Sequence, residues 1–255
     1  MYKLALAWLA AMMLASPLSA ADAGKPTVVL VHGAFADGAS WNHVLKILHD
    51  DGYQTIAVAN PLRGVQSDAR YVASIVDSID TSVVLVGHSY GGSVISEAAV
   101  GKDNVKSLVF VAAFAPDKGE SAAELSGKFP GGTLASALAN PVTLPDGGAD
   151  LYIDQKKFRE QFAHDVSAEE ASLMAATQRP IAKSALDEPA SAAAWKSIPS
   201  WFVYGDQDKN IPPAVQKFMA ERAKSKNTVV IPGASHVVMI SNPKTVASLI
   251  ENAAH

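Results

Sequence analysis

The 255-residue sequence contains no cysteine, and that absence excludes several kinds of chemistry. Without thiols the chain forms no disulfide, offers no cysteine nucleophile and supplies no thiolate ligand to a metal. The fold must therefore be held together by its packed core. Hydrophobic residues make up 49% of the chain, an ordinary supply for one large globular domain of this length.

An excess of positive charge is also lacking. The 21 lysines and arginines are outnumbered by 25 aspartates and glutamates, the net charge is −4, and no run of basic residues occurs. Proteins that bind nucleic acids neutralise phosphates with clustered basic side chains. We therefore expect no nucleic-acid partner.

Long hydrophobic runs are scarce, and the most extended one lies near residue 1. Lys3 precedes an apolar run over residues 4–15, and small residues follow at 16–23. This order is typical of a secretory signal peptide, and the run is shorter than the about 20 apolar residues that span a bilayer. We predict a cleaved signal peptide at 1–23, a periplasmic or secreted mature protein, and no membrane span in that mature protein. An uncleaved membrane anchor is the alternative.

The rest of the chain alternates apolar runs with helical patterns. Strands that are apolar throughout are typical of a parallel sheet that is covered by helices on both faces. We therefore predict an α/β fold with a mostly parallel sheet of about six strands. The expected strands are at 27–31, 53–59, 83–86, 105–111, 201–204 and 228–231.

The alternation breaks between residues 116 and 198. This stretch is rich in alanine, glycine and proline, and it shows helical patterns at 158–164 and 168–178 but no buried-strand run. We predict a helical cap insertion at 116–198 and a core made of 24–115 and 199–255. A disordered linker is the alternative, but its aromatic, leucine and methionine content argues against that interpretation.

The strongest chemical signal is Gly-His-Ser-Tyr-Gly at residues 87–91, directly after an apolar strand and before a helical pattern. A G-x-S-x-G motif in a strand–turn–helix context presents a nucleophilic serine at the carboxyl end of the strand. Ser89 is therefore the candidate nucleophile. The alternative interpretation is a glycine-rich turn whose serine has no chemical role.

A serine hydroxyl needs a base to accept its proton and an acid to orient that base. His236 follows a late strand, and Asp208 follows an earlier one, which gives the chain order serine, acid, histidine. We predict that Ser89, Asp208 and His236 form a catalytic triad. Asp206 competes with Asp208 for the role of the acid, and Asp208 fits the usual G-x-x-D pattern better.

The developing oxyanion needs two backbone N–H donors. We expect them from Tyr90, which follows the nucleophile, and from Ala34, in the loop after the first strand. Phe35 and Phe114 are candidate walls of the substrate pocket. No histidine pair has the spacing of zinc ligands, and no phosphate-binding or dinucleotide motif occurs, so we expect neither a metal nor a cofactor.

Residues 32–41, together with 87–92, resemble one branch of the α/β-hydrolase superfamily. That branch contains small bacterial esterases, plant methyl-ester esterases of the salicylate-binding type and plant hydroxynitrile lyases. The lyases carry threonine where this chain has Gly33 and lysine where it has Val237. Those side chains handle the cyanohydrin and the departing cyanide, so the resemblance favours ester hydrolysis.

The expected function is that of a carboxylic-ester hydrolase that acts on small to medium hydrophobic esters through an acyl-enzyme intermediate. Two alternatives remain at this point: a lyase of the hydroxynitrile type, and a ligand-binding protein that uses the same scaffold without catalysis.

Overall fold

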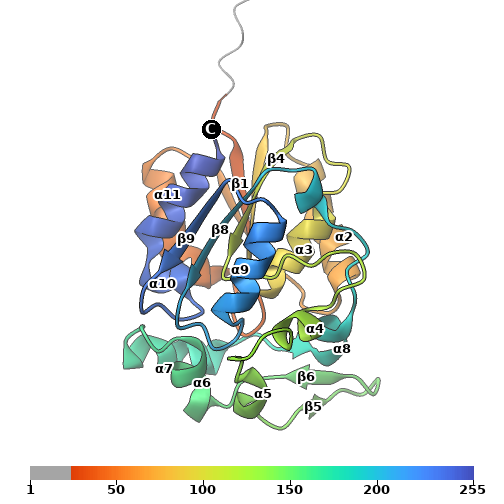
Figure 1. Cartoon of the computed structure of the whole chain (residues 1–255), viewed down its shortest axis with the longest axis vertical. Coiled ribbons are helices and arrows are strands. Elements are labelled where there is room, and N and C mark those ends of the chain that lie inside the picture. Colours follow the sequence, from red (N-terminus) through yellow and green to blue (C-terminus); the bar gives the residue numbers. More distant parts are fainter. Residues whose placement is uncertain (1–23) are drawn as a thin grey trace, which may run out of the picture.

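The computed structural model describes residues 24–255, and the predicted signal peptide at 1–23 lies outside these residues (Figure 1). The central sheet has six strands in the order β2-β1-β3-β4-β8-β9, and all of its pairings are parallel. This confirms the predicted α/β fold. The strands are β1 (Thr27–Val31), β2 (Thr55–Val58), β3 (Val83–His88), β4 (Val105–Val111), β8 (Ser200–Gly205) and β9 (Asn227–Ile231).

Helices cover both faces of this sheet, as Figure 1 shows. On one face α11 packs against β3, β4 and β8 with α1 beside it, and on the other α3 packs against β1, β3 and β4 with α2 beside it. The helices and turns of the core are η1 (Gly38–Trp41), α1 (Asn42–Asp50), α2 (Val65–Asp77), α3 (Tyr90–Ala98), α9 (Pro213–Arg222), α10 (Val238–Ser241) and α11 (Pro243–Ala253). No helix within residues 24–255 has the length and apolar character needed to cross a membrane.

Two-sided cover explains why the central strands are apolar throughout. Every residue of β1 and of β3 is buried, so neither face of those strands can carry a solvated side chain. The edge strand β9 is mostly exposed or half-buried. The central strands therefore form a rigid platform whose carboxyl ends carry the loops after β1, β3 and β8.

Residues 116–198, called the cap segment below, lie along the lower edge of the sheet in Figure 1 up to residue 187 and then return upward to contact α3 through η2. They hold more than the predicted helices, because a three-stranded antiparallel sheet in the order β5-β6-β7 also forms there. Its strands have only two or three residues, too few to give a recognisable apolar pattern. The elements are α4 (Ala122–Ser126), α5 (Leu134–Ala137), β5 (Val142–Thr143), β6 (Ala149–Leu151), α6 (Gln155–Phe162), α7 (Ala168–Thr177), β7 (Ile181–Ala182), α8 (Lys183–Asp187) and η2 (Ala194–Lys196).

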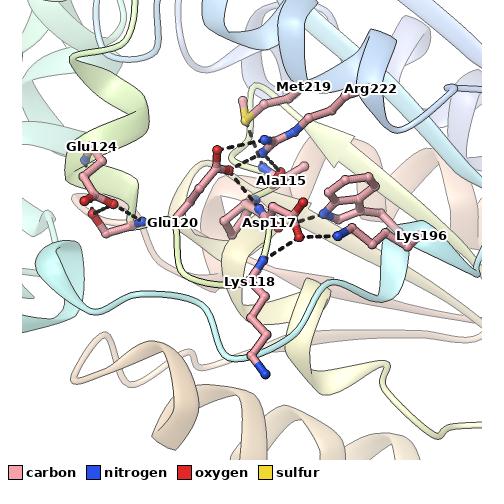
Figure 2. Close-up of polar contacts among 11 residues, drawn as sticks. Ala115, Asp117, Lys118, Glu120, Glu124, Lys196, Met219 and Arg222 are labelled. Carbon is pink, nitrogen blue, oxygen red and sulfur yellow. Dashed lines mark hydrogen bonds and ion pairs between the residues drawn. The ribbon is translucent and has the colours of Figure 1, made fainter.

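Both junctions between the core and the cap segment are fastened around Arg222, at the end of α9 (Figure 2). Its guanidinium donates to both carboxylate oxygens of Glu120, at 2.9 and 2.6 Å, and to the carbonyl of Ala115 at 2.6 Å. It also lies 5.3 Å from the ring centre of Trp195, whose indole N–H donates to the carbonyl of Pro116 at 2.8 Å. The outgoing and returning chains are thus tied to one core helix.

The charge of Glu120 depends on this arrangement. Burial alone would raise the pKa of its carboxyl, but the hydrogen bonds from Arg222 and from the backbone of Asp117 outweigh burial and hold the pKa below its usual value. A carboxyl with a depressed pKa stabilises the folded state above its unfolded pKa, and that contribution is lost as the pH falls through the folded pKa.

We expect Arg222→Met to lower the free energy of unfolding by about 2 kcal/mol at neutral pH, because it leaves a partly buried carboxylate without its partner. The measurement is urea unfolding followed by circular dichroism. The matched control is Lys217→Met on the same helix, which breaks only an exposed ion pair with Glu221 and should cost well under 1 kcal/mol. The difference between the variants should shrink in acid, where Glu120 is protonated. Equal losses would contradict the role of Arg222.

Candidate active site

Ser89 lies on a strained turn between β3 and α3. Its φ is 55° and its ψ is −125°, a region that side-chain-bearing residues rarely occupy. Hydrogen bonds hold it there: its N–H faces the carbonyls of Val111 and Ala112, and its carbonyl accepts from Gly92 and Phe114 at 3.0 and 3.1 Å. The surrounding backbone therefore over-determines the conformation that the motif predicts.

Two glycines are required because other backbone segments press against this turn. A Cβ on Gly91 would lie 2.4 Å from the carbonyl oxygen of Val31, at the end of β1. A Cβ on Gly33 would lie 2.5 Å from the Cβ of Ser89 and 2.7 Å from the carbonyl oxygen of His88. These distances are far below van der Waals contact. The loop after β1 can therefore approach Ser89 only with glycine at position 33.

The structure pairs His236 with Asp208 rather than with Asp206. Nδ1 of His236 lies 2.7 Å from Oδ2 of Asp208, and both side chains are fully buried. Asp206 is exposed and accepts a hydrogen bond from the N–H of Gly233 at 2.7 Å. The acid that orients the histidine ring is thus the one that the G-x-x-D pattern favours.

Four donors surround the Asp208 carboxylate. One oxygen accepts from the backbone of Asn210 and Ile211, at 2.8 and 3.0 Å, and the other from Nε2 of Gln216 at 2.8 Å, in addition to His236. A buried carboxylate is stable only when its lone pairs are satisfied in this way. Gln216 was not predicted from the sequence. The only signal was a polar residue among the apolar positions of α9.

The His236 ring is packed on two sides. Its centre lies 4.8 Å from that of His88 and 5.1 Å from that of Phe162, which comes from α6 of the cap segment. Nε2 is buried and has no hydrogen-bond partner within residues 24–255, and no hydrogen bond joins it to the hydroxyl of Ser89 in this structure. Because Nδ1 faces a carboxylate, a neutral ring carries its proton there, and Nε2 is left as the basic atom.

His88 and His32 support the backbone around the site. Nε2 of His88 lies 3.2 Å from the carbonyl of His236, and burial together with the neighbouring His236 holds the pKa of His88 well below its ordinary value. Nε2 of His32 accepts from the N–H of Asn60 at 3.1 Å, so its Nδ1 donates to the carbonyl of Gly33 at 2.9 Å. Burial also lowers the pKa of His32. Both rings therefore brace loops as neutral groups.

A cavity of about 50 Å³ opens at the hydroxyl of Ser89. Its wall contains five of the residues that the sequence analysis placed at the site, namely Ala34, Phe35, Ser89, Tyr90 and Phe114. Most of the remaining lining is apolar and includes Leu134 and Leu186 of the cap segment. The core and the cap segment thus enclose a small hydrophobic space beside the serine.

The two expected oxyanion donors both lie in this wall. Tyr90 is the first residue of α3, so its N–H has no partner within the helix. The N–H of Ala34 donates no hydrogen bond to another residue in the range 24–255. Both donors can therefore serve an oxygen atom in the cavity.

The Tyr90 side chain links this wall to the cap segment. Its hydroxyl donates to Asp68 at 3.0 Å, and the backbone N–H of Arg63 donates to the same buried carboxylate. The guanidinium of Arg63 then reaches Asp150 on β6 at 2.6 Å. Burial raises the pKa of Asp68, although these hydrogen bonds oppose the shift. This chain of contacts was not predicted from the sequence.

A serine on a strained turn after a central parallel strand, with an acid and a histidine after later strands, is the arrangement of the α/β-hydrolase class. The family model described as "Alpha/beta hydrolase family" matches residues 28–249. The chain belongs to this family.

Similar proteins carry names that state different activities. Salicylic acid-binding protein 2 of Nicotiana tabacum is 27% identical over 88% of this chain and 95% of its own length. An alpha-hydroxynitrile lyase of Arabidopsis thaliana is 24% identical over 86% of this chain and 93% of its own. The crystal structure of polyneuridine aldehyde esterase superposes with a TM-score of 0.78 at 21% identity and covers 91% of this chain and all of that one. The residues of the site must therefore decide the chemistry.

We expect Gly33→Ala to slow the labelling of Ser89 by a fluorophosphonate probe by about 100-fold, because a displacement of about 1 Å at a reactive group has an effect of that size. The rate is followed by gel fluorescence. Gly38→Ala is the matched control, since a Cβ there would meet nothing closer than 3.9 Å. Equal labelling rates in the two variants would show that position 33 does not constrain Ser89.

Proposed function

We propose that this protein is a serine hydrolase that cleaves carboxylic esters of small to medium hydrophobic substrates. The observation that carries the proposal is the combination of three features: the strained turn at Ser89, the buried pair of His236 and Asp208, and a mostly apolar cavity that is lined by Ser89 and by residues of the cap segment.

In the first half of the reaction, the hydroxyl oxygen of Ser89 attacks the ester carbonyl, and Nε2 of His236 accepts the hydroxyl proton. The N–H groups of Ala34 and Tyr90 stabilise the oxyanion. The tetrahedral intermediate then collapses, the bond to the alcohol oxygen breaks, and His236 gives its proton to the departing alcohol. Asp208 keeps the ring oriented and stabilises its charged form.

In the second half, a water molecule attacks the acyl group on Ser89, and His236 accepts the proton of that water. Collapse of the second tetrahedral intermediate releases the acid and returns the proton to the serine. In the present structure Nε2 of His236 and the serine hydroxyl are not hydrogen-bonded, so this contact forms when substrate binds, as is common for catalytic hydrogen bonds.

Cleavage of cyanohydrins by a lyase is the alternative, and two positions argue against it. A threonine at position 33 would bring its Cβ to the 2.5 Å contact with Ser89 described above. Val237 is fully buried, where a lysine charge would be unpaired. The measurement that separates the two functions is incubation with mandelonitrile: prompt cyanide release without esterase activity would support the lyase.

A ligand-binding protein on the same scaffold is the other alternative. It would need neither an oriented histidine nor a buried carboxylate with four donors, and both are costly to bury without a catalytic use. The fluorophosphonate probe discriminates here as well, because a protein that only binds its ligand should leave Ser89 unlabelled.

We propose further that the protein is exported and acts in the periplasm or outside the cell. The support is the order of residues near the start of the chain, where Lys3 precedes the apolar run at 4–15 and the small residues at 16–23. Mass spectrometry of protein recovered from the periplasm and medium tests this, and an intact residue 1 in all fractions would contradict it.

Ser89→Ala should lower kcat for p-nitrophenyl acetate by about 10³- to 10⁶-fold without loss of the fold, because it removes the attacking atom. Ser93→Ala is the matched control: it removes a buried hydroxyl of the following helix that has no hydrogen-bond partner within residues 24–255. Hydrolysis by Ser89→Ala at the rate of Ser93→Ala would refute the mechanism.

Asp208→Asn should lower kcat by about 10⁴-fold, because an amide no longer fixes the tautomer with its proton on Nδ1. Asp206→Asn changes the neighbouring exposed acid and should leave kcat near that of wild type. Steady-state hydrolysis of p-nitrophenyl acetate compares the two, with melting temperatures as a check on folding. A larger loss of kcat in Asp206→Asn than in Asp208→Asn would show that Asp208 is not the acid of the triad.

A further inference from the structure

A second and larger cavity, of about 320 Å³, adjoins the one at Ser89. It lies between α7 of the cap segment, the η1–α1 region and α10, and Leu173, Met174 and Ile240 give it an apolar strip beside polar residues that include Asp37, His43 and Glu170. Leu173 is 64% exposed, so it lines the part of the cavity that faces solvent. The two cavities share a single lining residue, Phe35.

Phe35 is held in place as a wall. Its φ is 61°, in the left-handed region that a phenylalanine rarely adopts. Its N–H donates to the carbonyl of Arg179 in the cap segment at 2.9 Å, and its ring stands edge-on to Phe162 with centres 6.2 Å apart. Backbone strain at one buried aromatic residue, fixed by a hydrogen bond and by ring packing, is typical of a position with a function.

The surroundings of His236 relate the larger cavity to the alcohol part of the ester in the proposed mechanism. His236 must protonate the leaving alcohol, so the alcohol part of the ester has to lie next to its ring. Ile240 lines the larger cavity and follows His236 by four residues, and the ring of Phe162 contacts both His236 and Phe35. The acyl part then occupies the opposite end of the small cavity, toward Phe114.

We propose that Phe35 sets the upper limit on the alcohol part of the substrate, and that the larger cavity is a binding subsite for a longer alcohol that the Phe35 ring closes off. This rests on the proposed ester hydrolysis. In the wild-type protein only a short alcohol fits beside His236. Without the ring, a linear alkyl chain continues from the small cavity along Met174 and Ile240 toward Leu173 at the rim.

The test uses two series of substrates on the full mature chain. One series holds the acid constant as acetate and lengthens the alcohol from ethyl to octyl, and the other holds the alcohol constant as ethyl and lengthens the acid. Phe35→Ala should raise the octyl-to-ethyl ratio of kcat/KM in the first series by at least about tenfold. Each methylene that moves from water into an apolar cavity changes binding by about fourfold, so a few methylenes suffice.

The matched control is Phe114→Ala. Phe114 lines only the cavity at Ser89, so its truncation removes the same ring without joining the two cavities. It should change the acid series rather than the alcohol series. Three outcomes would overturn the proposal. The octyl-to-ethyl ratio of kcat/KM could rise equally in both variants, or Phe35→Ala could change kcat/KM in the acid series alone. A folded Phe35→Ala could also show no change in either series.

Phe35→Leu replaces the alanine variant if that variant does not fold, and it should raise the octyl-to-ethyl ratio of kcat/KM by a smaller factor. A second readout does not need turnover: 1-octanol should raise the melting temperature of Phe35→Ala more than that of wild type or Phe114→Ala. If the wild type hydrolyses no ester of either series, the proposed function fails. The octanol measurement still decides whether Phe35 closes the second cavity.

Discussion

The left-handed backbone conformation of Ser89 is the constraint on which the rest of the site depends. It turns the chain from β3 into α3 within one residue, which places the hydroxyl at the sheet edge and the N–H of Tyr90 at a helix start. Such a conformation persists only where neighbouring groups hold it. The carbonyls at the end of β4 and the close approach of Gly33 provide that support. The presentation of the Ser89 hydroxyl therefore depends both on the register of the strands and on glycine at position 33.

The same logic extends to the histidine and its acid. Removing a carboxylate and an imidazole from water costs free energy. Four hydrogen bonds to the Asp208 carboxylate, one of them from His236, offset that cost. The donors come from the turn after β8 and from Gln216 on α9. The position of the ring is therefore set by the core, while Phe162 of the cap segment packs against the ring.

Much of this could be predicted from the sequence because the relevant signals are local. Apolar runs located the six strands of the central sheet, and the order of serine, acid and histidine pointed to one edge of that sheet. The signals failed where an outcome depends on distant contacts. The strands β5 to β7 are too short to carry a pattern, α10 has only four residues, and Phe162 and Gln216 matter only through partners far along the chain. The sequence favours Asp208 over Asp206 only through the G-x-x-D pattern. The short distance from Asp208 to Nδ1 of His236 distinguishes the two acids in the structure.

The fastening of both junctions to Arg222 has a consequence for how such a protein can diversify. Arg222 holds the two ends of the cap segment, while the interior of the segment contacts the surroundings of the site through Phe162, Arg179 and Asp150. We therefore expect changes in the cap segment to be tolerated best at its exposed residues, away from these contacts with the core. Insertions or exchanges that spare those three contacts would change the walls of the pocket and leave the geometry around Ser89 and His236 in place.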